Sequence, residues 1–268
     1  MISTMTVAAR ESVNERADQL DLGAAQIDQL FIIADAIALQ APLRRALSDP
    51  GLEPAAREEL SRRLLADKLD AAVIDVVAAA AAQAWPDEYQ FASAVLDQAV
   101  RAALRSHDDP SVVARQLFTF GQLVNRNPQL KESLRDGRIE LTHRRDLVAQ
   151  LMSQQADRLA VELARRSVND LGGRANSVES LIKHFLEVGA QAHGRTLAQA
   201  LTAQPMSQAQ CEQLQQQLER IYGTRIFLVT DVDPQVLGGV RVEVGDEVID
   251  GTVRARLEQV HHELKMGD

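Results

Sequence analysis

The spacing of hydrophobic and polar positions changes once along this 268-residue chain, close to its end. Up to about residue 193, apolar residues recur every three or four positions, which is the spacing of amphipathic helices. Near the end, Val240, Val242 and Val244 alternate with Arg241 and Glu243, which is the two-residue period of a half-buried strand. The pattern therefore predicts a long helical part followed by a segment that contains β-structure.

This predicted strand is followed by the signals of a hairpin and of a last helix. Gly245 begins a Gly-X turn of the kind that closes a hairpin onto Val248 and Ile249. Asp250 and Thr252 then offer side-chain oxygens that can cap a helix. The apolar face of that helix would consist of Val253, Leu257, Val260 and Leu264.

The helical part reads as a series of helices with short connections. In its first half we expect the helix Val7–Leu20 and a second whose apolar stripe is formed by Ile27, Leu30, Phe31, Ala34 and Ile37. They are followed by Leu43–Leu47, a helix beginning at Pro54, Ala71–Ala84 and Tyr89–Ser106. Asp49-Pro-Gly51 and Trp85-Pro86 interrupt the helical pattern. The polar segment His107 to Pro110 is the predicted boundary between two parts.

An internal repeat links these two parts. An offset of 87 residues aligns Phe31 with Phe118 without a gap. It also pairs Ile37 with Val124, Leu43 with Leu130, Leu47 with Leu134, Asp49 with Asp136, Leu52 with Ile139, Arg57 with Arg144, Leu60 with Leu147, Leu64 with Leu151 and Ile74 with Val161. Shared helical periodicity alone could produce some of these pairs. The matched breaks after Asp49 and Asp136 favour a duplication from Ser111 to about His193.

The C-terminal part predicts a small α/β module. Leu197 to Ala203 alternates as a first strand, and Arg225 to Thr230 reads as a second. Between them, Ser207 is placed to cap a helix that runs to Tyr222, with Gly223 just beyond its end.

The expected fold is thus mainly α, with a duplicated N-terminal helical bundle and a small C-terminal α/β module. We expect a bundle over residues 1–107, a second bundle-like unit over 108–193, and over 194–268 the module with its hairpin and C-terminal helix. Aromatic residues are only 3 % of the chain, so Ala, Leu, Val and Ile must form the core. Ala and Leu are strong helix formers, which supports this class.

Charge and hydropathy exclude some classes of protein. The formal net charge is −9, which argues against nucleic acid because phosphate binding requires a cationic face. The most apolar window, Ala71 to Trp85, is interrupted by Asp75 and Gln83 and falls short of the roughly 20 apolar residues of a membrane span. Met1 to Arg10 lacks the regions of a signal peptide, so we expect the protein to stay in the compartment where it is made.

The sequence contains no pattern that carries catalytic or metal chemistry. It has no glycine-rich phosphate loop, and its histidines lack the spacing of zinc ligands, so we expect no cofactor and no metal. Ser180-Leu-Ile-Lys183 matches a Ser-x-x-Lys pattern but lacks the companion motifs. Cys211, the single cysteine, is expected as a small core residue, with a reactive thiol as the less favoured alternative. An interaction protein is the better hypothesis.

The C-terminal module carries a resemblance to a known family. The segments Ile226 to Gly245 and Val248 to Leu257 resemble the signature of the F-type ATP synthase delta subunit, whose mitochondrial counterpart is the oligomycin-sensitivity-conferring protein. The residues that match this motif are Asp233, Gly238, Gly239, Gly245, Asp250 and Gly251. Gly238 and Gly239 are expected to permit positive φ or a tight strand entry. The added helical unit, with Arg far more frequent than Lys, is similar to the extended actinobacterial form.

The resemblance implies a non-catalytic stator subunit. Such a subunit binds N-terminal segments of the alpha subunits on its helical bundle and the b subunit on its C-terminal module, at the cytoplasmic face of the bacterial plasma membrane. The family places the alpha segment between the helices that correspond to Val7–Leu20 and Ala71–Ala84, which makes Val13, Val73 and Val77 candidate contacts. The alternative from the same residues is that these valines only pack the bundle. A helical adaptor unrelated to the ATP synthase is the alternative function.

Overall fold

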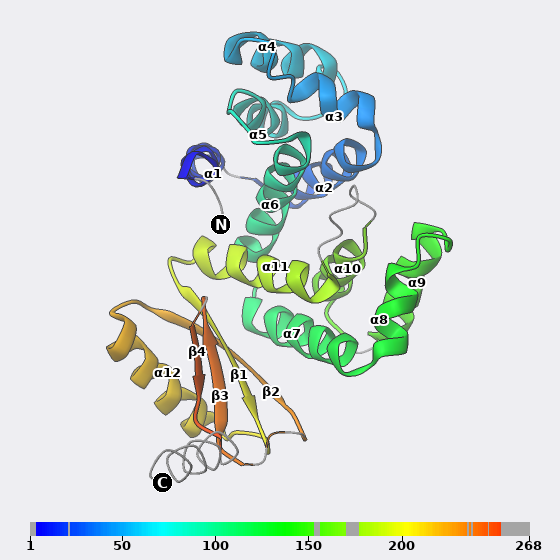
Figure 1. Cartoon of the computed structure of the whole chain (residues 1–268). Coiled ribbons are helices and arrows are strands. Elements are labelled where there is room, and N and C mark those ends of the chain that lie inside the picture. The colour runs from blue at the N-terminus through cyan, green and yellow to red at the C-terminus, as the bar shows by residue number, and fades with distance from the viewer. Residues whose placement is uncertain are drawn as a thin grey trace, which may run out of the picture. The chain divides into compact units, whose positions relative to one another are not determined.

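The computed structural model describes residues 4–20, 22–152, 156–169, 177–234, 236, 238–245 and 247–252. These residues form two compact units, and the chain passes from the first to the second between His107 and Asp108. The described residues of the first unit form helices, and those of the second form helices and one four-stranded sheet (Figure 1). The chain is therefore mainly helical with a small C-terminal sheet, as the sequence predicts.

Local sequence signals set the ends of the helices in the first unit. These helices are α1 (Thr4–Asp18), α2 (Ala24–Leu39), α3 (Ala41–Leu47), α4 (Pro54–Leu65), α5 (Ala71–Ala81) and α6 (Glu88–Ser106). Pro42 and Pro54 lie in the first turns of α3 and α4, where the missing N–H costs nothing. At the start of α6 the Asp87 carboxylate accepts hydrogen bonds from the backbone N–H groups of Tyr89 and Gln90.

The core of the first unit is built from small and branched aliphatic side chains. Helix α2 packs against α6, α4 packs against α5, and α1 lies against α5 and α6. On α5, Val73, Val76, Val77 and Ala80 have no exposed surface. Their small size lets the neighbouring helices approach closely, which explains how a bundle with few aromatic residues reaches a dense core.

The second unit repeats the helices of the first from α2 onward. Its helices before the sheet are α7 (Pro110–Arg126), α8 (Pro128–Arg135), α9 (Leu141–Leu151), α10 (Arg158–Ser167) and α11 (Val178–Ala192). When 87 is added to the bounds of α2, α3, α4 and α5, they match the bounds of α7, α8, α9 and α10, respectively, to within one residue. Shared periodicity does not explain such matched helix ends, so the structure supports the duplication.

A buried arginine occupies the same place in both repeats. Arg57 and Arg144 are only 5 % and 2 % exposed. Nη1 of Arg57 donates to the Leu52 carbonyl at 2.5 Å, and Nε of Arg144 donates to the carbonyl of Ile139, the counterpart of Leu52, at 3.0 Å. Because a buried guanidinium needs acceptors for its N–H groups, each arginine fixes the loop before its own helix.

The sheet has the order β2-β1-β3-β4. Its strands are β1 (Thr196–Thr202), β2 (Ile226–Val232), β3 (Val240–Val244) and β4 (Glu247–Asp250), and helix α12 (Gln208–Tyr222) connects β1 to β2. β1 and β2 are parallel, whereas β3 pairs antiparallel with both β1 and β4. Ser207 forms a capping box with Gln210, and Gly223 closes α12 with φ +66°, which confirms both predicted caps.

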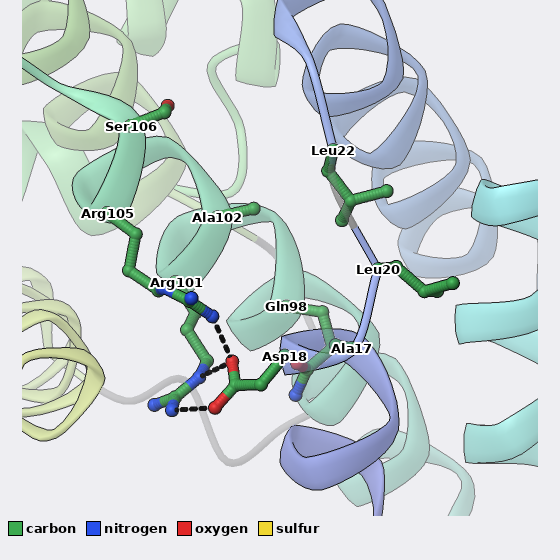
Figure 2. Close-up of a pocket in the computed structure, with 9 residues that line it drawn as sticks. All are labelled: Ala17, Asp18, Leu20, Leu22, Gln98, Arg101, Ala102, Arg105 and Ser106. Atoms are coloured by element: carbon green, nitrogen blue, oxygen red, sulfur yellow. Dashed lines mark hydrogen bonds and ion pairs between the residues drawn. The ribbon is translucent and has the colours of Figure 1, made fainter.

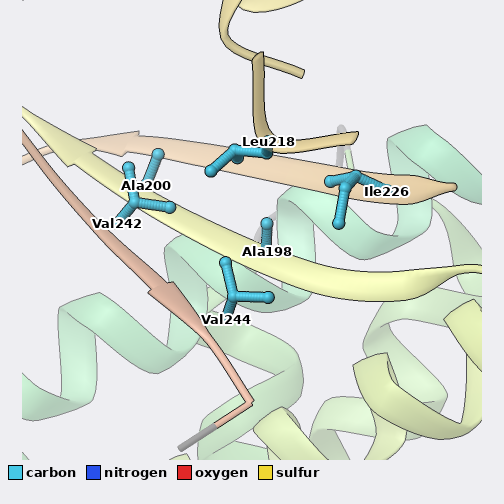
Figure 3. Packing of buried hydrophobic residues seen from close by; sticks show 6 residues of the cluster. All are labelled: Ala198, Ala200, Leu218, Ile226, Val242 and Val244. Carbon is cyan, nitrogen blue, oxygen red and sulfur yellow. The ribbon is translucent and has the colours of Figure 1, made fainter. Parts of the chain in front are cut away.

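Helix α12 and the sheet enclose a small hydrophobic core. Its buried residues alternate along the strands, as Figure 3 shows. They are Ala198 and Ala200 on β1, Leu218 on α12, Ile226 on β2, and Val242 and Val244 on β3. The two alanines on the central strand β1 leave room for the larger side chains around them.

Helices α7 and α11 pack against the sheet, so both belong to the same compact unit as β1 to β4. Arg126 on α7 forms an ion pair with Asp231 on β2 at 2.9 Å, and Lys183 on α11 forms one with Glu243 on β3 at 2.5 Å. The expected boundary after residue 193 therefore does not separate two compact units, because side chains of the sheet bind the preceding helices. The expected C-terminal helix with Val253 lies outside the described residues.

Candidate functional site

The valines predicted to contact a partner lie inside the first unit. Val13 on α1 and Val73 and Val77 on α5 have 0 % exposed surface. They pack α1 against α5 and present no side-chain surface to another protein in this conformation. Their burial supports the packing role, and their role as direct contacts stays a prediction that requires α1 to move.

Polar side chains cover the line along which α1 meets α5. Nη2 of Arg16 approaches Asp75 at 3.3 Å, and Asp75 also pairs with Arg62 on α4. The Gln83 amide donates to Ser12 at 3.3 Å. A partner segment that runs along α1 and α5 from outside would therefore first meet charged and amide groups.

The C-terminal end of α1 is attached to α6 by an arginine pair (Figure 2). Asp18 accepts hydrogen bonds from Nε and Nη2 of Arg101 at 3.0 and 2.6 Å, and it also pairs with Arg105. The hydrogen bonds from Arg101 are the main cause that lowers the pKa of the Asp18 carboxyl, and the charges of both arginines contribute. Together with the Arg10–Asp97 pair, they hold α1 on α6 at two points.

The glycines of the family motif have structural roles. Gly238 and Gly239 have φ +76° and +83°, which agrees with the expected positive φ. A Cβ on Gly239 would collide with the carbonyl of Gly251 and would lie 2.9 Å from Cα of Thr252. The Gly251 N–H in turn donates to the Val240 carbonyl at 3.0 Å. The chain segments before β3 and after β4 thus touch at a place where only glycine fits.

The remaining motif residues hold the ends of the strands. The Asp233 N–H donates to the Thr202 carbonyl at 2.8 Å, and its carboxylate lies 3.8 Å from Nε of Arg126. Gly245 forms the β3–β4 turn with φ +61°. Asp250 accepts from the Thr252 N–H at 3.0 Å. Sequence reasoning missed Arg126, because nothing in its local pattern marks a partner on a strand more than a hundred positions away.

The residues of the Ser-x-x-Lys pattern form structural contacts. Lys183 of the Ser-x-x-Lys pattern donates to Glu243 and to the Gly245 carbonyl, while Ser180 lies 3.0 Å from the Ser177 hydroxyl. Cys211 is only half-buried on α12, so its expected place in the core is wrong. The face of α12 that packs on the sheet is narrower than the sequence pattern suggests, since it buries Leu218 but not Cys211.

Within the described ranges, no group of three or more His, Cys, Asp or Glu side chains is arranged to hold a metal ion. None of the helices described is both long and apolar enough to cross a membrane.

Comparison with known proteins identifies relatives along nearly the whole chain. The family described as "ATP synthase delta (OSCP) subunit" matches residues 88–264. The chain is 36 % identical over 243 residues to the ATP synthase subunit delta of Frankia alni, and the match covers 88 % of this chain and 86 % of the relative. It is 33 % identical to that of Cutibacterium acnes, with 97 % and 99 % covered, and 32 % identical to that of Streptomyces avermitilis, with 97 % and 96 % covered.

Proposed function

Because this chain belongs to the ATP synthase delta (OSCP) family, we propose that it is the stator subunit that links the catalytic head of the F-type ATP synthase to the b stalk. The family match over residues 88–264 carries this proposal, since it spans both the second helical repeat and the motif of the sheet. Family membership speaks against an unrelated helical adaptor. The proposed role is mechanical and non-catalytic: the subunit resists the torque that the rotor exerts on the head.

Internal ion pairs support a mechanical role. Within the first unit, Arg101 and Arg105 attach α1 to α6 through Asp18. Within the second unit, Arg126 and Lys183 attach α7 and α11 to the sheet. A subunit under torque benefits from such cross-links, because they oppose sliding of one element past another.

We assign the alpha subunits to the helical bundle and the b subunit to the C-terminal sheet. An alpha segment that follows α1 and α5 would contact Arg16, Asp75 and Gln83 on the surface, with Val13 and Val77 beneath them. A stator that works under load needs a dissociation constant in the nanomolar range, about −12 kcal/mol. Through these partners the chain would lie peripherally at the cytoplasmic face of the plasma membrane.

Binding of the full-length chain to a purified ATPase head that lacks it tests the proposal. We expect nanomolar binding to the intact head and a loss of at least tenfold when the alpha N-terminal segments are removed by proteolysis. A peptide with the b C-terminal sequence should protect backbone amides of β3 and β4 from hydrogen exchange. If neither the head nor the peptide binds, the stator assignment is wrong.

A further inference from the structure

The internal duplication reveals an exposed apolar face on the first unit. Ile32 and Leu39 lie on α2, and each is 64 % exposed. They are seven positions apart, so they stand two turns apart, about 10 Å, on one face of the helix. Single exposed apolar side chains are common on protein surfaces. What distinguishes this pair is the role of its counterparts in the second unit.

The counterparts of Ile32 and Leu39 in the second unit form hydrogen bonds with the sheet. The 87-residue offset places Ile32 opposite Thr119 and Leu39 opposite Arg126 on α7. Thr119 donates to Asp231 on β2 at 3.2 Å, and Arg126 donates to the same carboxylate at 2.9 Å. On α7 this face therefore contacts β2 through polar side chains, although Thr119 stays exposed, whereas the described residues of the first unit include no strand that could contact it.

The change of side chains between the repeats fits a change from an internal partner to an external one. On α7 the partner β2 is part of the same chain, so its effective concentration is high and polar contacts suffice. A separate partner must overcome the cost of association, for which buried apolar side chains at the centre of a contact are suited. Isoleucine and leucine at the positions equivalent to Thr119 and Arg126 fit such an external contact.

The charge beside this pair indicates what kind of partner fits. Asp28 lies one turn before Ile32 on the same face, is exposed, and forms no ion pair with any described residue. Its counterpart on α7 is Arg115, so the sign of the charge is reversed between the repeats. A partner for Asp28, Ile32 and Leu39, called here the α2 stripe, should therefore carry apolar side chains next to Lys or Arg.

A helix suits this stripe better than a strand. A single strand laid across helix side chains would leave its backbone N–H and C=O groups without partners, whereas β2 is paired with β1 along one of its edges. A helix satisfies its own backbone and can present apolar residues at the same two-turn spacing. We propose that the α2 stripe binds a basic amphipathic helix of another subunit of the ATP synthase. This inference rests on the proposed stator function.

The test compares head binding by three full-length proteins. These are the wild type, the double variant Ile32→Ser/Leu39→Ser, and the control Ile221→Ser, whose side chain is 68 % exposed on α12. We expect the double variant to bind the delta-depleted ATP synthase at least about tenfold more weakly, and the control to bind as the wild type does. The fluorescence of Trp85, in the first unit, should give the same urea midpoint for the wild type and the double variant, which shows that the variant folds.

Two further measurements address the chemistry of the partner. Asp28→Lys should weaken binding several-fold at low salt and less at high salt, whereas Glu132→Lys, an equal charge change at an exposed position of α8, should not. A photo-crosslinker at position 32 should capture a helical segment with lysine or arginine beside apolar residues.

The outcomes separate this inference from the proposed function. If the wild type does not bind the depleted complex, the stator function itself fails. If the wild type binds and the double variant binds equally well, the function stands and the α2 stripe is not a docking face. If the stripe instead joins two copies of this chain, seen as a dimer that the double variant abolishes, the proposed partner is wrong.

Discussion

Arg57 offers a sharp test of how the first repeat is stabilised. Its guanidinium is almost completely buried and donates to carbonyls at the end of α5 and in the loop after α3. The acceptors are the carbonyl oxygens of Asp49, Leu52, Ala81, Ala82 and Gln83. We predict that Arg57→Met, which keeps much of the side-chain volume, destabilises the first unit by about 3 kcal/mol.

This magnitude depends on which of the acceptor carbonyls can bind water once the arginine is removed. Asp49 and Leu52 lie on the surface, so their carbonyls can exchange the arginine for water at little cost. The carbonyls at the end of α5 are less accessible, and the bond from Nε to Ala81, at 2.6 Å, is buried. Loss of charged hydrogen bonds at two such acceptors, at about 1.5 kcal/mol each, gives about 3 kcal/mol.

Trp85 provides the assay. It is the single tryptophan of the chain, and its Nε1 donates to the Ala80 carbonyl, next to the acceptors of Arg57. Its fluorescence during urea unfolding therefore follows the first unit. The matched control is Arg63→Met on the same helix, α4. The Arg63 side chain is 76 % exposed and, among the described residues, pairs only with Glu59, which predicts a change below about 0.5 kcal/mol.

The result that refutes this reasoning is a small effect at Arg57. If Arg57→Met and Arg63→Met shift the free energy of unfolding equally, the buried guanidinium does not hold the end of α5. Arg57→Lys adds a further check, since one ammonium cannot reach acceptors spread over α5 and the preceding loop. It should recover less than half of the loss.

Other predictions address the sheet, the end of α1 and the bundle core. Gly239→Ala should lower the stability of the second unit by more than about 2 kcal/mol in thermal unfolding, because a Cβ there meets backbone atoms. The control Gly194→Ala, also at positive φ but in open space, should lower it by only about 1 kcal/mol. Equal losses of stability in the two variants would contradict the predicted clash. Asp18 has a lowered pKa in the folded state. Its contribution to stability is therefore fully present above its unfolded pKa of about 4 and is lost as the pH falls through the pKa of the folded state. Asp18→Asn should therefore be less stable than the wild type at pH 7, and the difference in urea midpoint should shrink towards pH 2; a constant difference would exclude the ionic contribution of Arg101. Val77→Asp should lower the free energy of unfolding of the first unit by about 4 kcal/mol, because it buries a carboxylate at a site with no exposed surface. Trp85 fluorescence measures this change, and a stable variant with unchanged fluorescence would show that the side chain at position 77 can reach solvent.

The sequence was sufficient for most of the local structure. The period of three to four residues predicted helices up to about residue 193, and the alternation around Val242 predicted a strand, because both periods follow from backbone geometry. Ser207 and Gly223 predicted the ends of α12, since capping depends on residues close in the chain. The glycine motif and the 87-residue repeat pointed to the family and to the matching helices.

Only the tertiary structure decided which apolar side chains are buried and what covers them. The sequence predicted Val77 as a residue that a partner contacts and Cys211 as a core residue, yet Val77 has no exposed surface and Cys211 is only half-buried. The ion pair between Arg126 and Asp231 forms between α7 and β2, which are far apart in the sequence and come together only in the fold. The physical reason is that a helix determines the directions of its own side chains, whereas burial depends on the neighbouring elements, which the local pattern does not encode.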